Sequence, residues 1–230
     1  MPEPAESAVE LSFFDMRTRV LLWQQDLELL NQEEQVRAAR FHFERDRSMF
    51  VCCRAQLRRI LAEHTGCAPA AIQLQAGPRG KPALVGGKIE FNVSHAGHWF
   101  ACAVSEQTPL GVDIEEEHPL RDMVAVAEHF FAPAEVMQLF ATDEKDRTRS
   151  FFECWTRKEA VIKATGEGIS RPLDSFEVAF GPGVLPALLR LDSQKTPGWQ
   201  MLSFEPAPGY IAALTATGRL GPVRTLIYSR

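Results

Sequence analysis

The sequence predicts an α+β fold built by duplication, with two similar α/β subdomains and a cleft between them. Short apolar runs typical of strands alternate with longer stretches of helical periodicity. One long helical segment occurs in each half of the chain, and the other expected elements follow the same order around both. The 230 residues are 45% hydrophobic and 24% charged, a globular composition that can bury a substantial core.

The first half is expected to open with a strand and to place its long helix before a set of strands. Its expected elements are a strand at 9–14, helices at 32–41 and 45–63, and strands at 71–75, 88–93 and 99–105. The long helix should end near Gly66, and the Gly- and Pro-containing turns GPRGKP and GG separate the strands.

The second half repeats this plan. Its expected elements are a strand at 110–115, helices at 123–141 and 146–165, and strands at 175–180, 199–204, 209–216 and 223–229. The order of strand, helices and further strands is the same as in the first half, which favours two related subdomains.

A repeat links the two long helices, because five residues recur 102 positions later. They are Arg47, Ser48, Phe50, Cys52 and Ile60, matched by Arg149, Ser150, Phe152, Cys154 and Ile162. With the shared order of elements, these matches favour a tandem duplication. We therefore divide the chain into an N-terminal subdomain, 1–106, and a C-terminal subdomain, 107–230, and expect a small ligand to bind between them.

Charge and cysteine content limit the function classes. The net charge is −5, so no bulk attraction to nucleic acid or to an anionic membrane is expected. The five cysteines form no C-x-x-C pair, and we expect reduced thiols, with Cys52 and Cys154 in the core. The N-terminus lacks the apolar stretch of a signal peptide, and no apolar run reaches the roughly 20 residues of a membrane span. We expect a cytoplasmic protein.

Glu159 occupies an unexpected place on the second long helix. Phe152, Trp155 and Ile162 recur at the spacing of one buried stripe, and Glu159 lies on that stripe with Lys163 one turn later. In isolation such an i,i+4 pair is solvated and contributes roughly a few tenths of a kcal/mol. On a buried face, however, the carboxylate is a candidate metal ligand if further carboxylates face it.

The segment PLGVDIEEE supplies two such carboxylates. On a strand, Val112 and Ile114 share one face, while Asp113 and Glu115 point together from the other. An acidic strand end is the simpler interpretation. Converging carboxylates also suit Mg²⁺, which commonly takes one or two of them and leaves other positions for water and phosphate. With Glu159 as a third ligand, Lys163 would be placed to meet an anionic substrate.

Two polar stretches and one basic helix start favour anion binding. In FNVSHAG, Ser94 and His95 follow an apolar strand, where they either cap a turn or contact a phosphate. The turn GPRGKP carries Arg79 and Lys81, a pattern shared by anion sites and by ordinary surface turns. Arg45 begins the first long helix, where a solvated charge is the ordinary interpretation.

Taken together, these segments resemble the Sfp-type 4′-phosphopantetheinyl transferases. The matching motifs, in family order, are GKP (80–82), FNVSHAG (91–97), GVDIE (111–115) and WTRKEAVIKATGEG (155–168). They span most of the chain, and the W…KEA form resembles the branch that serves broad-range carrier-protein modification. The resemblance implies a pseudo-twofold monomer with coenzyme A in the cleft, its nucleotide side on 1–106, and Mg²⁺ and the catalytic helix on 107–230.

The resemblance also implies roles for individual residues. Matches to the family's metal ligands are Asp113, Glu115 and Glu159, and matches to its catalytic residues are Asp113, Glu159 and Lys163. Matches to its coenzyme A contacts are Arg45, Arg79, Lys81, Ser94, His95 and Lys163. Glu159 corresponds to the proposed general base, Lys163 to the lysine near the transferring group, and His95 to a 3′-phosphate contact.

Two departures from the family pattern leave details open. Position 96 is Ala where the family often has Ser or Thr, which removes one hydroxyl contact. Basic residues at the start of the first long helix vary across the family, so the sequence leaves open whether Arg37, Arg40 or Arg45 reaches a phosphate.

The implied reaction moves 4′-phosphopantetheine from coenzyme A to a serine of an apo acyl or peptidyl carrier protein and releases adenosine 3′,5′-bisphosphate. Because the serine belongs to the partner, no nucleophile motif such as G-x-S-x-G is needed here. The alternatives are a metal-dependent nuclease, against which the acidic charge stands, and a non-catalytic carrier-binding homologue. Which carrier is served, and whether acylated coenzyme A is accepted, is open.

A surface for the carrier protein can also be predicted. Carrier proteins are typically acidic around the modified serine, so an acidic enzyme needs a local apolar surface with a nearby basic group. The expected segment follows the metal-binding strand and contains Arg121, Met123, Val124, Val126, Phe130 and Phe131.

Overall fold

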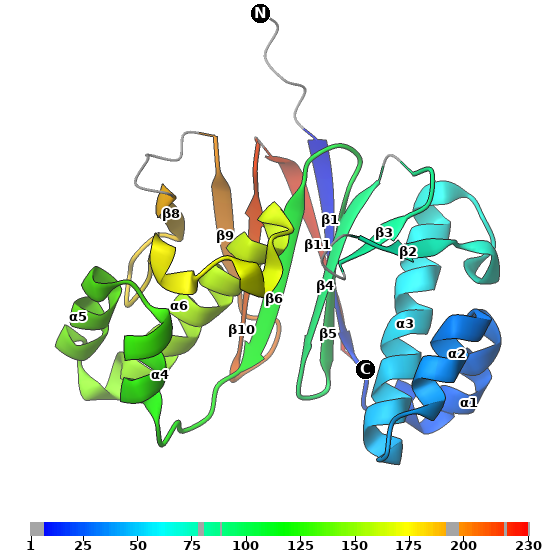
Figure 1. Cartoon of the computed structure of the whole chain (residues 1–230), viewed down its shortest axis with the longest axis horizontal. Coiled ribbons are helices and arrows are strands. Elements are labelled where there is room, and N and C mark those ends of the chain that lie inside the picture. The colour runs from blue at the N-terminus through cyan, green and yellow to red at the C-terminus, as the bar shows by residue number, and fades with distance from the viewer. Residues whose placement is uncertain (1–6, 78–80, 88, 192–197, 219, 230) are drawn as a thin grey trace, which may run out of the picture.

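The computed structural model describes residues 7–77, 81–87, 89–191, 198–218 and 220–229, and its fold is α+β as the sequence predicts. The strands form a central layer, and the helices lie in two groups at opposite ends of the long axis (Figure 1). The α-helices are α1 (Trp23–Asp26), α2 (Gln32–Ala39), α3 (Glu44–Thr65), α4 (Met123–Phe130), α5 (Pro133–Ala141) and α6 (Glu144–Thr165). The strands are β1 (Ser7–Asp15), β2 (Leu74–Ala76), β3 (Pro82–Leu84), β4 (Glu90–Ala96), β5 (Trp99–Ser105), β6 (Leu110–Glu116), β7 (Phe176–Ala179), β8 (Ala187–Leu191), β9 (Gln200–Phe204), β10 (Tyr210–Ala216) and β11 (Leu220–Tyr228).

Two main sheets meet in the middle of the molecule. Their strand orders are β11-β1-β5-β4 and β6-β10-β9, and each half adds a small hairpin, β2-β3 or β7-β8. The first strand of each half pairs antiparallel with the second strand of a later hairpin, β1 with β5 and β6 with β10. Edge strands β4 and β6 lie side by side (Figure 1), and the Val112 N–H donates to Asn92 Oδ1 at 2.8 Å between them. We call this β4–β6 boundary the seam.

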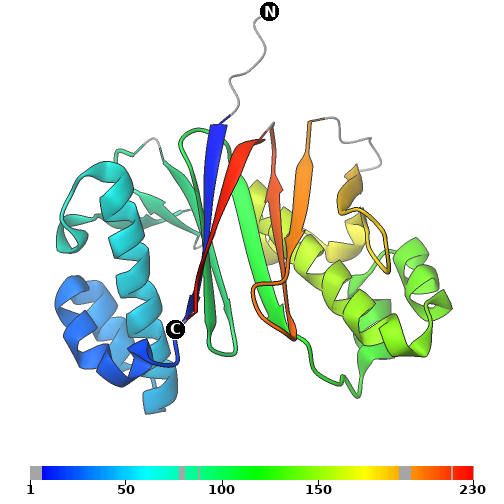
Figure 2. The same cartoon turned by 180° about the vertical axis from the view of Figure 1, so that it is seen from behind.

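The last strand, β11, lies in the sheet of the first half. It pairs in parallel with β1, with Leu11 opposite Thr225, at the edge of that sheet (Figure 2). The division of the chain into 1–106 and 107–230 therefore stays a prediction, since one strand of the second range is built into the sheet of the first.

The duplication is present, but its register differs from the sequence alignment. Helices α3 and α6 each have 22 residues, begin 100 positions apart, and end before Gly66 and Gly166, whose φ angles are 70° and 69°. The preceding residues, Thr65 and Thr165, each accept a hydrogen bond from the N–H two residues on, at 3.4 Å. The shift of 102 is wrong by two residues, or about 200° of helix rotation, because chance identities outweighed the burial pattern.

The same register places a buried cation in each long helix. Arg58 Nε donates to Glu34 Oε2 at 2.9 Å, and Lys158 Nζ lies 2.6 Å from Glu135 Oε2. Both carboxylates also accept the N–H of the residue at the start of their own short helix, Asn31 or Ala132. Each cation donates in addition to two backbone carbonyls downstream of its helix. These matched ion pairs anchor α2 to α3 and α5 to α6.

The helix predicted at 123–141 is two helices. Pro133 begins α5, and proline both lacks an N–H and disfavours helical geometry in the residue before it. The chain therefore turns at Phe131 and Ala132, which are extended. Short helical turns between Arg19 and Leu29, strand β3 and strand β8 were not predicted.

A shared core fixes which way the strands face. Val9, Leu11 and Phe13 of β1 pack in one buried cluster with Val112 and Ile114 of β6. Since side chains alternate along a strand, the intervening residues of β1 and β6 point outward, toward α3 and α6. This alternation positions the candidate site.

Candidate functional site

Strand β6 and helix α6 touch through their backbones at Gly111. A Cβ at this position would lie 2.1 Å from the Ala160 oxygen and 2.4 Å from the Ala164 nitrogen, so only glycine permits the contact. The side chains of the neighbouring helical turn are thereby brought close to Asp113, two residues along the strand.

Three polar side chains meet where the seam passes under α6. Lys163 Nζ lies 2.6 Å from Asp113 Oδ1 and 3.0 Å from Ser94 Oγ, and Ser94 Oγ donates to the same Asp113 oxygen at 2.8 Å. Asp113 is 3% exposed, whereas the side chain of Lys163 keeps 26% of its surface. Strand β4, strand β6 and helix α6 thus each contribute one member of this triad.

The other two predicted carboxylates lie in the field of Asp113. Burial and the Asp113 charge raise the pKa of Glu115 to about 7, and the same two causes raise the pKa of Glu159. Lys163 opposes both shifts, and the Trp155 indole, which donates to Glu115, opposes one of them. One lysine therefore faces three carboxylates, and the site favours a further positive charge.

The donors of this site suit a hard divalent cation. Asp113 Oδ2 is buried and has no hydrogen-bond partner among the described residues, so one carboxylate oxygen is left unsatisfied by the protein. No three Asp, Glu, His or Cys side chains in the described ranges form a ready-made metal site. Mg²⁺ needs no such group, because it commonly takes one or two carboxylates and completes its shell with water and phosphate.

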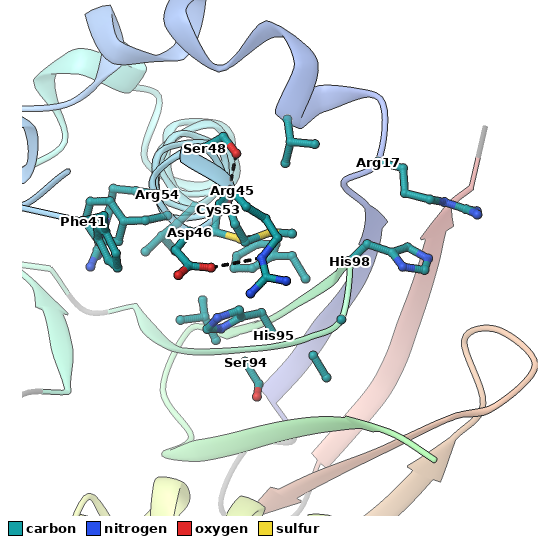
Figure 3. A pocket seen from close by; sticks show the side chains of 18 of the residues that line it. Arg17, Phe41, Arg45, Asp46, Ser48, Cys53, Arg54, Ser94, His95 and His98 are labelled. Atoms are coloured by element: carbon teal, nitrogen blue, oxygen red, sulfur yellow. Dashed lines mark hydrogen bonds and ion pairs between the residues drawn. The ribbon is translucent and has the colours of Figure 1, made fainter. Parts of the chain in front are cut away.

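A large cavity opens on the first-half side of the seam, between α3 and β4 (Figure 3). It has a volume of about 1020 Å³, and its lining includes Ser94. Its lining includes four arginines, two histidines and one carboxylate: Arg17, Arg37, Arg45, Arg54, His95, His98 and Asp46. We call it the arginine pocket; a cavity of this size and charge suits a polyanionic small molecule.

The arginines of this pocket differ in freedom. The side chain of Arg45 is 90% exposed and points from α3 toward His95 (Figure 3). Arg54 is held by Glu34 at 3.5 Å, and burial lowers the pKa of its guanidinium. Arg37 and Arg54 lie over the Phe50 ring, 5.0 and 5.8 Å from its centroid. Arg45 pairs at 3.3 Å with its neighbour Asp46 and is held weakly, whereas Arg54 is held in place by Glu34 and the Phe50 ring.

Successive residues of β4 serve the two regions. Ser94 turns toward β6 and the triad, and His95 points up into the arginine pocket (Figure 3). Burial and the charge of Lys163 lower the pKa of His95, which favours its neutral imidazole in the free protein. The pocket and the carboxylate site are therefore contiguous.

Most of the predicted residues converge, with two exceptions. Lys81 donates to the carbonyls of Leu110 and Lys163 at 3.1 and 2.9 Å, and it does not line the arginine pocket. Arg79 lies outside the described residues. The roles of all these residues stay predictions.

Sequence reasoning missed several members of the site. Arg17 and Arg54 come to the pocket from β1's end and from within α3, where no local pattern separates them from surface arginines. Trp155 packs against the core, as the buried stripe predicts, but its indole N–H also donates to Glu115, which periodicity does not indicate. The Asn92 amide oxygen joins β4 to β6 by accepting the Val112 N–H across the seam. A polar residue within an apolar strand was the sequence signal that could have identified it.

The described helices contain no stretch that is both long enough and apolar enough to cross a membrane.

The described cysteines are free, and Cys52 and Cys154 are buried in their helices as predicted. In the segment predicted to contact the carrier protein, Val124 is 52% exposed and Phe131 is 2% exposed, so part of the segment is surface and part is core.

Comparison with known proteins gives concordant matches in both halves. Residues 109–215 match the family model of the 4′-phosphopantetheinyl transferase superfamily, and residues 19–107 match the model of the N-terminal region of 4′-phosphopantetheinyl transferases. The chain is 36% identical over 193 residues to the 4′-phosphopantetheinyl transferase HetI of a Nostoc species, covering 82% of this chain and 79% of the relative. It is 29% identical over 191 residues to the 4′-phosphopantetheinyl transferase Sfp of Bacillus subtilis, covering 83% of each. A further relative, psf-1 of Bacillus pumilus, is 34% identical over 177 residues, covering 76% of this chain and 74% of the relative.

Proposed function

The chain belongs to the 4′-phosphopantetheinyl transferase superfamily and is a transferase enzyme, and on this premise we propose its reaction. It transfers the 4′-phosphopantetheine group of coenzyme A to a serine hydroxyl of an apo acyl or peptidyl carrier protein and releases adenosine 3′,5′-bisphosphate. The reaction depends on Mg²⁺.

One observation carries the proposal: the arginine pocket and the carboxylate site share Ser94. A nucleotide with phosphates at both ribose ends fits a pocket lined by arginine and histidine. Its pyrophosphate then extends past Ser94 to the triad. The phosphorus that is transferred would lie where Lys163 and the carboxylates face each other, which is the arrangement that phosphoryl transfer needs.

The reacting groups on the protein are Lys163 and Glu159. In the transfer, the serine oxygen of the carrier forms a bond to the phosphorus that bears pantetheine, and the bond from this phosphorus to the bridging oxygen breaks. Glu159 would accept the serine proton, directly or through one water, since its carboxylate faces Asp113 and Lys163 at the place where the phosphorus would lie. Lys163 leaves Asp113 for the phosphate oxygens and neutralises charge on the leaving bisphosphate.

Asp113, Glu115 and Glu159 would hold the divalent cation, which supplies neutralising charge to the pyrophosphate. Asp113 fits this role best, since its buried Oδ2 has no partner among the described residues. Binding of the cation would also favour the ionised form of Glu115, whose pKa of about 7 leaves it partly protonated at neutral pH in the free protein.

The proposal is tested by incubating the protein with coenzyme A, Mg²⁺ and an apo carrier protein and weighing the carrier by mass spectrometry. We expect a gain of one phosphopantetheine group that requires Mg²⁺. An unmodified carrier that forms only a complex would support a non-catalytic homologue, and cleavage of added nucleic acid would support a nuclease; either result would refute the proposed reaction.

A further inference from the structure

The side chain of Lys81, in the first half, connects the two halves of the molecule by donating to backbone carbonyls of the second half. Its ammonium donates to the carbonyl of Leu110, the first residue of β6, and to the carbonyl of Lys163, in the last turn of α6. The backbone at Lys81 is itself held, because its carbonyl accepts from the Gly77 N–H at 2.8 Å. A side chain from the loop before β3 thus ties a strand to a helix.

The two carbonyls flank the closest contact between β6 and α6. Leu110 precedes Gly111, whose missing Cβ lets the backbone of α6 approach. Lys163 lies two residues before the end of α6, so its carbonyl has no N–H partner within the helix. A cation at this end of a helix satisfies such carbonyls and interacts favourably with the helix dipole.

Lys163, whose carbonyl accepts a hydrogen bond from Lys81, also contributes its side chain to the triad. Lys163 reaches from α6 to Asp113 and Ser94. Because the last turn of a helix frays readily, the position of the Lys163 ammonium depends on what holds that turn. Lys81 lines a separate cavity of about 230 Å³, with Phe91 and Gly166, rather than the arginine pocket.

We propose that the Lys81 side chain is a positioning residue for Lys163 rather than a ligand of the nucleotide phosphates. It fixes the last turn of α6 on β6, and thereby sets where the Lys163 ammonium stands relative to Asp113. The inference rests on the proposed function for its kinetic readout, and on the Lys81 contacts alone for its structural readout.

Lys81→Met tests the inference, with Lys145→Met as the control because Lys145 is exposed at the other end of α6. We expect Lys81→Met to lower kcat by about ten- to a hundredfold, the loss typical of a misplaced catalytic group. The Kd for coenzyme A, measured by calorimetry, should stay within about twofold of wild type, a change of under 0.5 kcal/mol. A large rise in Kd with kcat unchanged would instead make Lys81 a nucleotide contact and overturn the inference.

A double variant separates positioning from a general loss of structure. If Lys81 acts through Lys163, Lys81→Met should cost little further activity in a Lys163→Met background, since the group that it positions is already gone. Multiplication of the two losses would contradict the inference.

Hydrogen exchange supplies a readout that needs no transferase activity. Amides at the end of α6, around 163–167, should exchange faster in Lys81→Met than in wild type and Lys145→Met, while those of α3 stay unchanged. Unchanged exchange at the end of α6 would contradict the inference. If wild type transfers no phosphopantetheine but the α6 amides respond as expected, the proposed function fails and the positioning contact stands.

Discussion

Helices α3 and α6 occupy matching places in the two halves, yet they present different chemistry to their sheets. At the register of 100, Arg58 matches Lys158, and each is buried with a glutamate from the preceding short helix. One residue later the halves diverge. Arg59 pairs with the buried carboxylate of Asp26, whereas Glu159 faces the like charge of Asp113.

The strands under these helices show the same divergence. Outward-facing Phe14 of β1 packs with the core beneath α3, and Ser12 is buried beside it. The corresponding positions on β6, counted from Phe13 and Ile114 in the shared core, are Asp113 and Glu115. The duplicated scaffold is therefore kept in both halves, and among these matched positions the like-charged carboxylates beneath the long helix occur in the second half. Such local destabilisation is typical of functional sites.

Removing the shared scaffold should give the largest effect, with a loss of stability in both halves. Lys158→Met leaves Glu135 buried without its cation, and we expect it to lower the free energy of unfolding by about 3–5 kcal/mol. Arg58→Met should cost less, because Glu34 keeps Arg54 as a second cation. Chemical denaturation measures both losses, and unchanged stability in either variant would show that its ion pair does not anchor the two helices.

Changing Asp113, whose counterpart in β1 is Ser12, should affect catalysis rather than stability. Asp113→Asn should lower kcat/KM by about a hundred- to a thousandfold, because the cation loses its buried ligand and Lys163 loses its ionised partner. The melting temperature should stay the same or rise. The matched change in β1, Ser12→Ala, should leave kcat/KM within about twofold of wild type. Near-normal activity of Asp113→Asn at limiting Mg²⁺ would contradict the proposal that the second half carries the catalytic carboxylates.

The strain among the carboxylates should appear as a pH effect on stability. The pKa of Glu115 is about 7 in the folded protein and 4.5 in its unperturbed state, so the folded form binds the proton more tightly. Stability is therefore lost as pH rises from about 4.5 to 7. Glu115→Gln should melt about 2–4 °C above wild type at pH 8 without divalent cation. The difference should vanish near pH 4.5, and a constant difference at all pH values would contradict the assignment.

The smallest expected effect concerns the carrier protein, which should dock on the second half. Val124, exposed on α4 near the predicted Arg121, is the best residue to change. Val124→Glu should raise the KM for the carrier about three- to tenfold through repulsion of its acidic surface and leave the KM for coenzyme A unchanged. Leu21→Glu, at an exposed apolar site of the first half, is the control. Equal effects of the two changes would place the docking surface elsewhere.

The sequence predicted what local periodicity encodes. Strands β5 and β6 and both long helices lie within two residues of their expected bounds, and alternation placed Asp113 and Glu115 on one face. It did not predict the break at Pro133, although the proline itself was a sufficient signal. The contacts of Lys81 could not be predicted from the sequence, for a different reason. They join residues 29 and 82 positions apart through backbone carbonyls, which leave no trace in side-chain patterns.

The central claim is that the first half binds the nucleotide and the second half performs the transfer. Its most direct test is the rate of the first turnover at saturating coenzyme A, measured for His95→Ala and Asp113→Asn. We predict that His95→Ala weakens coenzyme A binding about tenfold, reduces discrimination against 3′-dephospho-coenzyme A, and turns over within about threefold of wild type. Asp113→Asn should bind coenzyme A and fail to turn over at a comparable rate. Equal losses of first-turnover rate in both variants would contradict the claim.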